Sequence, residues 1–228
     1  DFRCMSNKKS IAVIYDDLIH DQKVLTYREL WEKSDRIAHW ILNQQVHIGE
    51  FVGVQMKVSE LLPIVFLGIW KAGASFVPIG VNESKERIDK IKKDCIHIIT
   101  ERQALEAIQY GEYTGQLPDI LPEMTVYCMY TSGSTGQPEL VMISHASLAW
   151  RVHWMVEQYG KSGAVLQKAS YTFDVSMWEF FLPLCQGEIL YLLPDCYRAD
   201  PYKIVKAIQR GKIATIHFVP AMLSIFLT

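Results

Sequence analysis

The sequence predicts an α/β fold with mixed, largely parallel sheets flanked by helices. Short β-branched and aromatic runs alternate with longer segments of helical period, a rhythm typical of strand–helix–strand crossover units. Half of the 228 residues are hydrophobic and 21% are charged. This composition suffices to bury one sizeable core or two small ones.

The β-branched and aromatic runs predict eight strands, at residues 11–15, 51–56, 75–78, 96–100, 126–130, 164–168, 189–193 and 214–219. Segments of helical period predict helices at residues 26–43, 60–70, 84–93, 147–158 and 201–210, and an apolar helix start at 221. Thr26 and Glu29 have the spacing of a capping box at the start of the first helix.

One segment, residues 111–123, is loop-like and long enough to be a linker, because it contains Gly115, Pro118 and Pro122. It predicts a division between two subdomains near residue 120. The first residues do not resemble a signal peptide, and we expect residues 1–228 to be a piece of a longer protein.

Composition and spacing argue against several classes of partner. The net charge of -2 offers no basic surface for nucleic acid. The longest apolar run, residues 61–70, is about half the ~20 residues that a membrane span needs. Five cysteines without a C-x-x-C pair and seven histidines without H-E-x-x-H spacing predict no metal site and a cytoplasmic, reducing location.

The most informative segment is the loop Y-T-S-G-S-T-G-Q-P at residues 130–138, which follows an apolar strand and precedes a helix expected after Ser144. Its glycines let backbone N–H groups turn inward, and its hydroxyls add donors that suit phosphate oxygens. It matches neither a Walker loop nor a dinucleotide fingerprint. The alternative is a flexible polar turn. The candidate phosphate-binding residues are Thr131, Ser132, Gly133, Ser134, Thr135 and Gly136.

This loop resembles the phosphate-binding signature of the adenylate-forming (AMP-binding) superfamily. Three further segments resemble family motifs in order and spacing: L-T-Y-R-E-L at residues 25–30, W-K-A-G-A-S-F-V-P-I at 70–79, and F-D-V-S-M-W-E at 173–179. The last is similar to a motif of nonribosomal peptide synthetases. The resemblance implies the first part of the large N-terminal domain of an amino-acid adenylation domain, without its C-terminal lid domain. We interpret the first two segments as scaffold.

Asp174 is the first candidate for binding the amino acid. It lies in an apolar and aromatic stretch, residues 171–184, where a buried carboxylate needs a cation. No Lys or Arg occurs between Lys168 and Arg198, so a ligand ammonium is a reasonable partner. The resemblance implies that this carboxylate holds the α-amino group of the substrate. The alternative is a helix N-cap.

The resemblance also implies that Val175, Trp178 and His217 line the pocket, in an order similar to that of serine-activating domains. Trp178 would restrict the pocket to a small side chain, and His217 could hydrogen-bond a hydroxyl. L-Serine is therefore the expected substrate. The alternative for His217 is a strand histidine that faces solvent or packs on the sheet.

No residue of the chain is a convincing catalytic acid, base or nucleophile. The resemblance implies ATP and Mg²⁺, and transfer of the acyl group to phosphopantetheine on a peptidyl carrier protein domain, whereas nucleic acid and membrane are not expected partners. The family continues its loop with P-K-G, but this chain has Glu139 after Pro138, which reverses a charge beside the triphosphate. Two alternatives stay open: an acyl-CoA synthetase, and a degenerate, non-catalytic binding or scaffold domain.

Overall fold

The computed structural model describes residues 9–112, 115–131, 139–161 and 163–227, and it confirms the α/β class. The chain divides into two units, one of Asp1–Leu30, Val58–Glu60 and Arg151–Thr228, the other of Trp31–Lys57 and Leu61–Trp150. Each contains one five-stranded sheet. Residue 120, the division point suggested by the sequence, lies inside the second unit, whereas α1 and α5 are each divided between the two.

The sheet of the first unit has the strand order β10-β8-β9-β1-β2. Its neighbouring strands are parallel except β1 and β2, which pair antiparallel. The strands are β1 Ile11–Tyr15, β2 Lys23–Thr26, β8 Val165–Gln167, β9 Leu190–Leu192 and β10 Thr215–Ile216. Four of them were predicted, although β10 is shorter than residues 214–219. The sequence analysis missed β2, an edge strand in which Val24 is exposed and only Leu25 is buried.

Crossover helices join the parallel strands of this sheet: α6 Val175–Gln186 between β8 and β9, and α7 Pro201–Gly211 between β9 and β10, with the short helix η2 Asp195–Tyr197 before α7 and α8 Pro220–Phe226 last. Helix α7 begins at Asp200, whose side chain accepts from the Lys203 N–H. Its apolar face buries Ile204 and Ala207 against Leu166 and Tyr191 of the sheet. These contacts form the core of the first unit.

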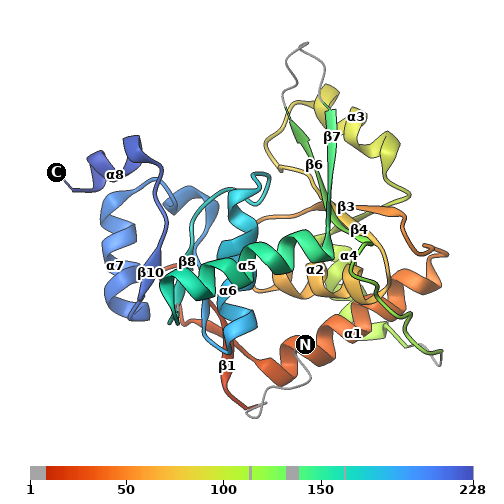
Figure 1. The fold of residues 1–228 in the computed structure, drawn as a ribbon, viewed down its shortest axis with the longest axis horizontal. Helices are drawn as coiled ribbons and strands as arrows, with labels where there is room; N and C mark the ends of the chain where they lie inside the picture. The colour runs from red at the N-terminus through yellow and green to blue at the C-terminus, as the bar shows by residue number, and fades with distance from the viewer. Residues whose placement is uncertain (1–8, 113–114, 132–138, 162, 228) are drawn as a thin grey trace. The chain divides into compact units, whose positions relative to one another are not determined.

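The sheet of the second unit has the order β5-β3-β4-β6-β7 and is parallel except for the antiparallel pair β6 and β7, which Figure 1 draws in green. Its strands are β3 Phe51–Gln55, β4 Ser75–Pro78, β5 His97–Thr100, β6 Thr125–Thr131 and β7 Glu139–Ser144. Helix α1 Tyr27–Asn43 precedes β3, helices α2 Leu61–Lys71, α3 Lys85–Asp94 and α4 Glu101–Tyr110 connect the strands from β3 to β6, and α5 His145–Tyr159 follows β7. The sequence analysis missed α4 and β7.

Stacked aromatic rings fill the core of the second unit. Phe66 of α2 stacks on Phe76 of β4 with ring centroids 4.0 Å apart, and Phe76 stacks in turn on Tyr127 of β6 at 5.7 Å. The Lys71 ammonium donates to the Asp35 carboxylate at 2.8 Å and lies 3.3 Å from the centroid of the Trp31 ring. The motif around Lys71 therefore joins α2 to α1, as its scaffold interpretation predicts.

The predicted capping box opens α1. The Thr26 N–H donates to the Glu29 carboxylate at 2.8 Å, and the Glu29 N–H donates to the Thr26 hydroxyl at 3.2 Å. Tyr27 is buried at the start of this helix, and its hydroxyl donates to the Glu188 carbonyl at 2.7 Å. Burial raises the pKa of the Tyr27 hydroxyl, which keeps it protonated as a donor. This segment is also scaffold.

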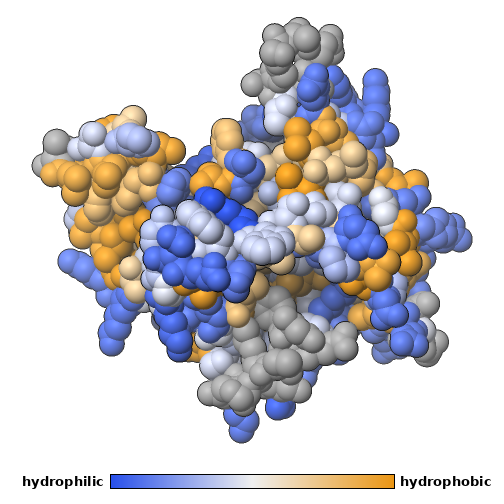
Figure 2. Space-filling model, viewed as in Figure 1, coloured by the Kyte–Doolittle hydropathy of each residue, from blue (hydrophilic) through white to orange (hydrophobic). Residues whose placement is uncertain are grey.

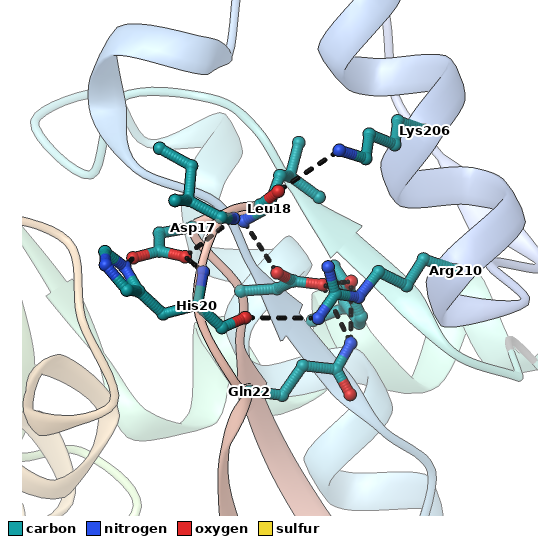
Figure 3. Close-up of polar contacts among 9 residues, drawn as sticks. Asp17, Leu18, His20, Gln22, Lys206 and Arg210 are labelled. Carbon is teal, nitrogen blue, oxygen red and sulfur yellow. Dashed lines mark hydrogen bonds and ion pairs between the residues drawn. The ribbon is translucent and has the colours of Figure 1, made fainter.

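A buried carboxylate organises the loop that follows β1 (Figure 3). Asp16 has no exposed surface and accepts from the Leu18 N–H at 2.7 Å, from the Gln22 amide at 2.8 Å and from the Tyr191 hydroxyl. The Arg210 Nε atom, on α7, lies 3.1 Å from its Oδ2 atom. Figure 3 also shows Lys206 of α7 donating to the Leu18 carbonyl. Two residues of α7 thus hold one loop of the same unit.

Apolar side chains gather on the surface around α8, in the orange region at the upper left of Figure 2. Val219, Leu223, Ile225 and Leu227 are all exposed there. The apolar helix start expected at residue 221 thus corresponds to α8, which begins at Pro220. Among the described residues, no helix is both long enough and apolar enough to span a bilayer.

Candidate functional site

Strands β6 and β7 carry the candidate phosphate loop between them. Thr131 is the last residue of β6 and Glu139 the first of β7; the two are paired across the ladder, and both are exposed. The other candidate loop residues, Ser132, Gly133, Ser134, Thr135 and Gly136, lie outside the described part of the chain. The loop therefore belongs to an antiparallel hairpin.

This placement includes a strand that was not expected. The sequence analysis predicted a helix after Ser144, and α5 does start at His145, but it did not predict the six-residue strand β7 that lies between the loop and this helix. The apolar run Leu-Val-Met-Ile at residues 140–143 was the signal for that strand. The physical reason is that β6 would otherwise present an open edge, and the returning chain pairs with it.

One cation lies near the end of β6. The Arg87 Nη2 atom, on α3, is 3.5 Å from the Tyr130 carbonyl oxygen, and its Nε atom is 3.2 Å from a carboxylate oxygen of Glu83. The Tyr130 hydroxyl donates to the Asp94 carboxylate at the end of the same helix. Helix α3 thus supports the strand from which the loop leaves.

Asp174 lies at the start of α6, where its carboxylate accepts from the Val175 N–H at 2.8 Å. The carboxylate is exposed, so the expectation that it is buried in the apolar stretch is wrong. The reason is that burial begins two residues later at Ser176, whereas Phe173 is still 64% exposed. Asp174 has the position of a cap, and its carboxylate is accessible to a ligand.

Val175 and Trp178 lie in the first turn of α6, three positions apart. This spacing places their side chains on the same helix face, and Asp174, four positions before Trp178, lies at the end of that face. Val175 is half-buried and Trp178 is buried. Helix formation from residue 175 onward therefore brings three of the four predicted amino-acid-binding residues together.

His217 follows β10, and its ring meets the Trp178 ring edge to face, with centroids 5.7 Å apart and an interplanar angle of 84°. Its side chain is 33% exposed. Burial, and secondly the positive charge of Lys168, lower the pKa of the imidazole, which favours its neutral form. A neutral imidazole has one donor and one acceptor nitrogen, and either can bind a hydroxyl. The predicted residues Trp178 and His217 are thus in contact.

Glu179 is a residue of this site that the sequence analysis quoted within a motif but assigned no role. It follows Trp178 in α6 and has no exposed surface. One carboxylate oxygen, Oε2, accepts from the N–H groups of Lys168 and Ala169 at 3.0 and 2.9 Å. The other, Oε1, lies 3.9 Å from the His217 Nδ1 atom. Burial raises the pKa of Glu179 to about 7.

Lys168 completes this group of side chains at the end of β8. Its ammonium lies 4.8 Å from the centroid of the Phe218 ring. Burial lowers the pKa of Lys168, the Arg198 charge lowers it further, and the negative charge of Glu179 opposes the shift. A single glutamate in a run of aromatic and aliphatic residues was the available signal for this group, because such a carboxylate must find donors inside the fold.

No group of three or more His, Cys, Asp or Glu residues within the described ranges could hold a metal ion.

Comparison with known proteins identifies the family. The sequence profile of the AMP-binding enzyme family matches residues 3–97 and 95–228. The chain is 34% identical over 238 residues to a mycosubtilin synthase protein of Bacillus subtilis, in a match that covers 95% of this chain and 9% of that protein. It is 35% identical over 230 residues to zwittermicin A synthase ZmaJ of Bacillus cereus, covering 92% and 44%. The chain spans less than half the length of either relative.

The fold agrees with this assignment. The N-terminal subdomain of Klebsiella oxytoca NpsA, solved in complex with 3-hydroxyanthranilyl-AMSN, superposes with a TM-score of 0.86 at 24% identity, over 99% of this chain and 60% of that one. The architecture is thus that of the first part of the N-terminal subdomain of an adenylate-forming enzyme. Because the family profile matches nearly the whole sequence, the chain belongs to the AMP-binding enzyme family.

Proposed function

We propose that the chain is part of an amino-acid adenylating enzyme of the nonribosomal peptide synthetase kind, with L-serine as its substrate. In the first step a carboxylate oxygen of serine attacks the α-phosphorus of ATP. The new O–P bond forms while the bond to pyrophosphate breaks. In the second step the phosphopantetheine thiolate of a peptidyl carrier protein domain attacks the acyl carbon, and AMP leaves.

Each candidate residue then has a distinct role. The hydroxyl and backbone N–H groups of the loop donate to the phosphate oxygens of ATP, which carries Mg²⁺ on those oxygens; the loop residues are Thr131, Ser132, Gly133, Ser134, Thr135 and Gly136. The Asp174 carboxylate binds the α-ammonium of serine. Val175 and Trp178 limit the size of the side chain, and His217 hydrogen-bonds its hydroxyl. None of these residues transfers a proton, so catalysis by this part of the enzyme rests on positioning and charge.

The observation that carries the proposal is the contact between Trp178 and His217. A broad aromatic surface beside a neutral imidazole favours a ligand that is both small and hydroxylated. The exposed Asp174 carboxylate at the start of the same helix offers a site for an ammonium. Serine combines these three features.

A second candidate function is a non-catalytic binding or scaffold domain. Glu139 favours it, because this exposed carboxylate stands at the end of the candidate phosphate loop where the family has a lysine. At ~6 Å and an effective dielectric near 20, two like unit charges repel by roughly 2 to 3 kcal/mol, and solvent reduces this further. The charge therefore weakens ATP binding without abolishing it.

The test is amino-acid-dependent exchange between ATP and pyrophosphate, measured on the complete protein. We expect the highest kcat/KM with L-serine and at least a tenfold lower value with L-alanine, which lacks the hydroxyl. A preference for phenylalanine or leucine would overturn the serine assignment. Exchange only with carboxylic acids that lack an amino group would identify an acyl-CoA synthetase, and no exchange with any acid would favour the scaffold.

A further inference from the structure

The two carboxylate oxygens of Glu179 have unequal surroundings. Oε2 is saturated, because it accepts from the N–H groups of Lys168 and Ala169 and from the Gln167 amide at 3.2 Å. These three donors come from the end of β8 and the residues that follow it, and they fix the plane of the carboxylate. The side chain therefore cannot turn away from the position in which the structure places it.

Oε1 is buried and has no hydrogen-bond partner among the described residues. It lies 3.9 Å from the His217 Nδ1 atom, which is about one ångström beyond a hydrogen bond. The His217 side chain is one-third exposed and has room to move, whereas Glu179 is held by its other oxygen. Hydrogen bonds of this kind are often long without substrate and shorten when it binds.

Within the described part of the chain, few charged groups face this pair. Lys168 approaches from the end of β8, and Arg198, from the segment after η2, acts on Lys168. Burial raises the pKa of Glu179 to about 7 and lowers that of His217, so above neutral pH the pair consists of a carboxylate and a neutral imidazole.

We propose that Glu179 is a positioning residue that binds the His217 Nδ1–H group through its free oxygen and thereby leaves the Nε2 lone pair for the hydroxyl of the substrate. The link to a substrate hydroxyl rests on the proposed function. A carboxylate can only accept, so it selects the tautomer with the proton on Nδ1. The Nε2 atom is then an acceptor that a serine hydroxyl satisfies and an alanine methyl does not.

The substitution Glu179→Gln should reverse the tautomer preference of His217. The amide oxygen can keep the bonds from Lys168 and Ala169, which directs the amide N–H group toward Nδ1 and moves the imidazole proton to Nε2. Glu157→Gln is the matched control, because Glu157 and His153 form an exposed pair on α5 with an Nε2 to Oε1 distance of 3.2 Å. Circular dichroism and thermal unfolding verify that each variant is folded.

The first readout does not require catalysis. Diethyl pyrocarbonate modifies the unprotonated nitrogen of a neutral imidazole, and mass spectrometry of peptides from the complete protein gives the rate at His217. We expect Glu179→Gln to slow this rate at least threefold at pH 7.5, and Glu157→Gln to leave it unchanged. An equal rate in the wild type and in the Glu179→Gln variant would overturn the proposal.

The second readout is the ratio of kcat/KM for serine to that for alanine. We expect Glu179→Gln to lower this ratio at least fivefold, and to have no further effect on it when His217→Gln is already present. A drop that persists in the double variant would assign Glu179 a purely structural role and overturn the proposal. If the variant does not fold, the wild-type ratio decides: it should fall as the pH drops from 8 to 6, and a constant ratio would overturn the proposal.

The two readouts separate the two proposals. A changed modification rate in a protein that shows no preference for serine would retain the positioning role and reject the substrate. A serine preference with an unchanged modification rate would retain serine as the substrate and reject the positioning role of Glu179.

Discussion

Replacing Asp16 by alanine should strongly destabilise the protein, because this carboxylate is the common partner of four groups. The Leu18 N–H, the Gln22 amide and the Tyr191 hydroxyl all donate to it, and Arg210 forms an ion pair with it. Alanine would leave the hydroxyl and the N–H group inside the fold without their acceptor. Each such group costs about 1 to 3 kcal/mol when it stays unpaired.

The magnitude follows from the exposure of the partners. Breaking a fully buried ion pair costs about 3 to 5 kcal/mol. The Arg210 side chain is 36% exposed, so water can solvate its guanidinium after the change and the lower end applies. We therefore expect the free energy of unfolding to fall by about 3 kcal/mol, or roughly 6 to 12 °C in Tm for a chain of this size.

Urea unfolding followed by circular dichroism measures this change. The matched control is Asp17→Ala, since Asp17 is the neighbouring carboxylate and, among the residues that the structure describes, its hydrogen bonds stay within its own loop, to Ile19 and His20. The urea midpoint of the Asp17→Ala variant should shift from the wild-type value much less than that of the Asp16→Ala variant. Equal midpoints for the two variants would refute the reasoning, because the contacts with α7 and β9 would then contribute nothing.

Three further predictions concern the candidate site. Glu179 should make stability depend on pH: its folded pKa of about 7 exceeds the ordinary 4.5, so the free energy of unfolding should fall by about 3 kcal/mol as the pH rises through this window. Glu179→Gln should remove that slope in urea titrations, and identical slopes would contradict the prediction. Asp174→Ala should lower serine-dependent exchange at least tenfold and stability by about 1 kcal/mol, the usual value of a helix cap. Asp174→Asn should retain the cap but not the exchange; if it restores both, the carboxylate does not bind the ammonium. Glu139→Lys should lower the KM for ATP or raise turnover several-fold, with a smaller gain at high salt. Glu123→Lys, before the opposite end of β6, is its control, and equal effects of the two changes would show that residue 139 does not act on the triphosphate.

Features that depend on neighbouring residues were predictable from the sequence. The capping box of Thr26 and Glu29 is a local pattern, and it stands in the structure at the predicted place. Helix α4 was missed although Thr100 and Gln103 have the same spacing and form the same bonds. No loop separates α4 from β5, so no turn residues mark the point where the strand ends and the helix begins.

The arrangement around His217 was only partly predictable. The shared helix face of Asp174, Val175 and Trp178 follows from their spacing once α6 is known, but the sequence analysis predicted no helix at residues 175–186. The approach of Glu179 to His217 joins residues 38 positions apart, which no local rule can anticipate. The burial of Asp174 was wrongly expected because apolar composition says nothing about where a helix starts to pack.

The pairing of Thr131 with Glu139 also limits how this protein can change in length. Successive residues of a strand point to opposite faces, and Leu140 packs against the cluster of Val77, Ile79, Ile91 and Cys128. If the change in register were passed on to β7, one residue inserted in the loop would place Glu139 where Leu140 packs against that apolar cluster, and one residue deleted would place Val141 there and turn Leu140 to the other face. Evolution can therefore vary the loop's chemistry one residue at a time, but it can vary the loop's length only if the hairpin register is kept.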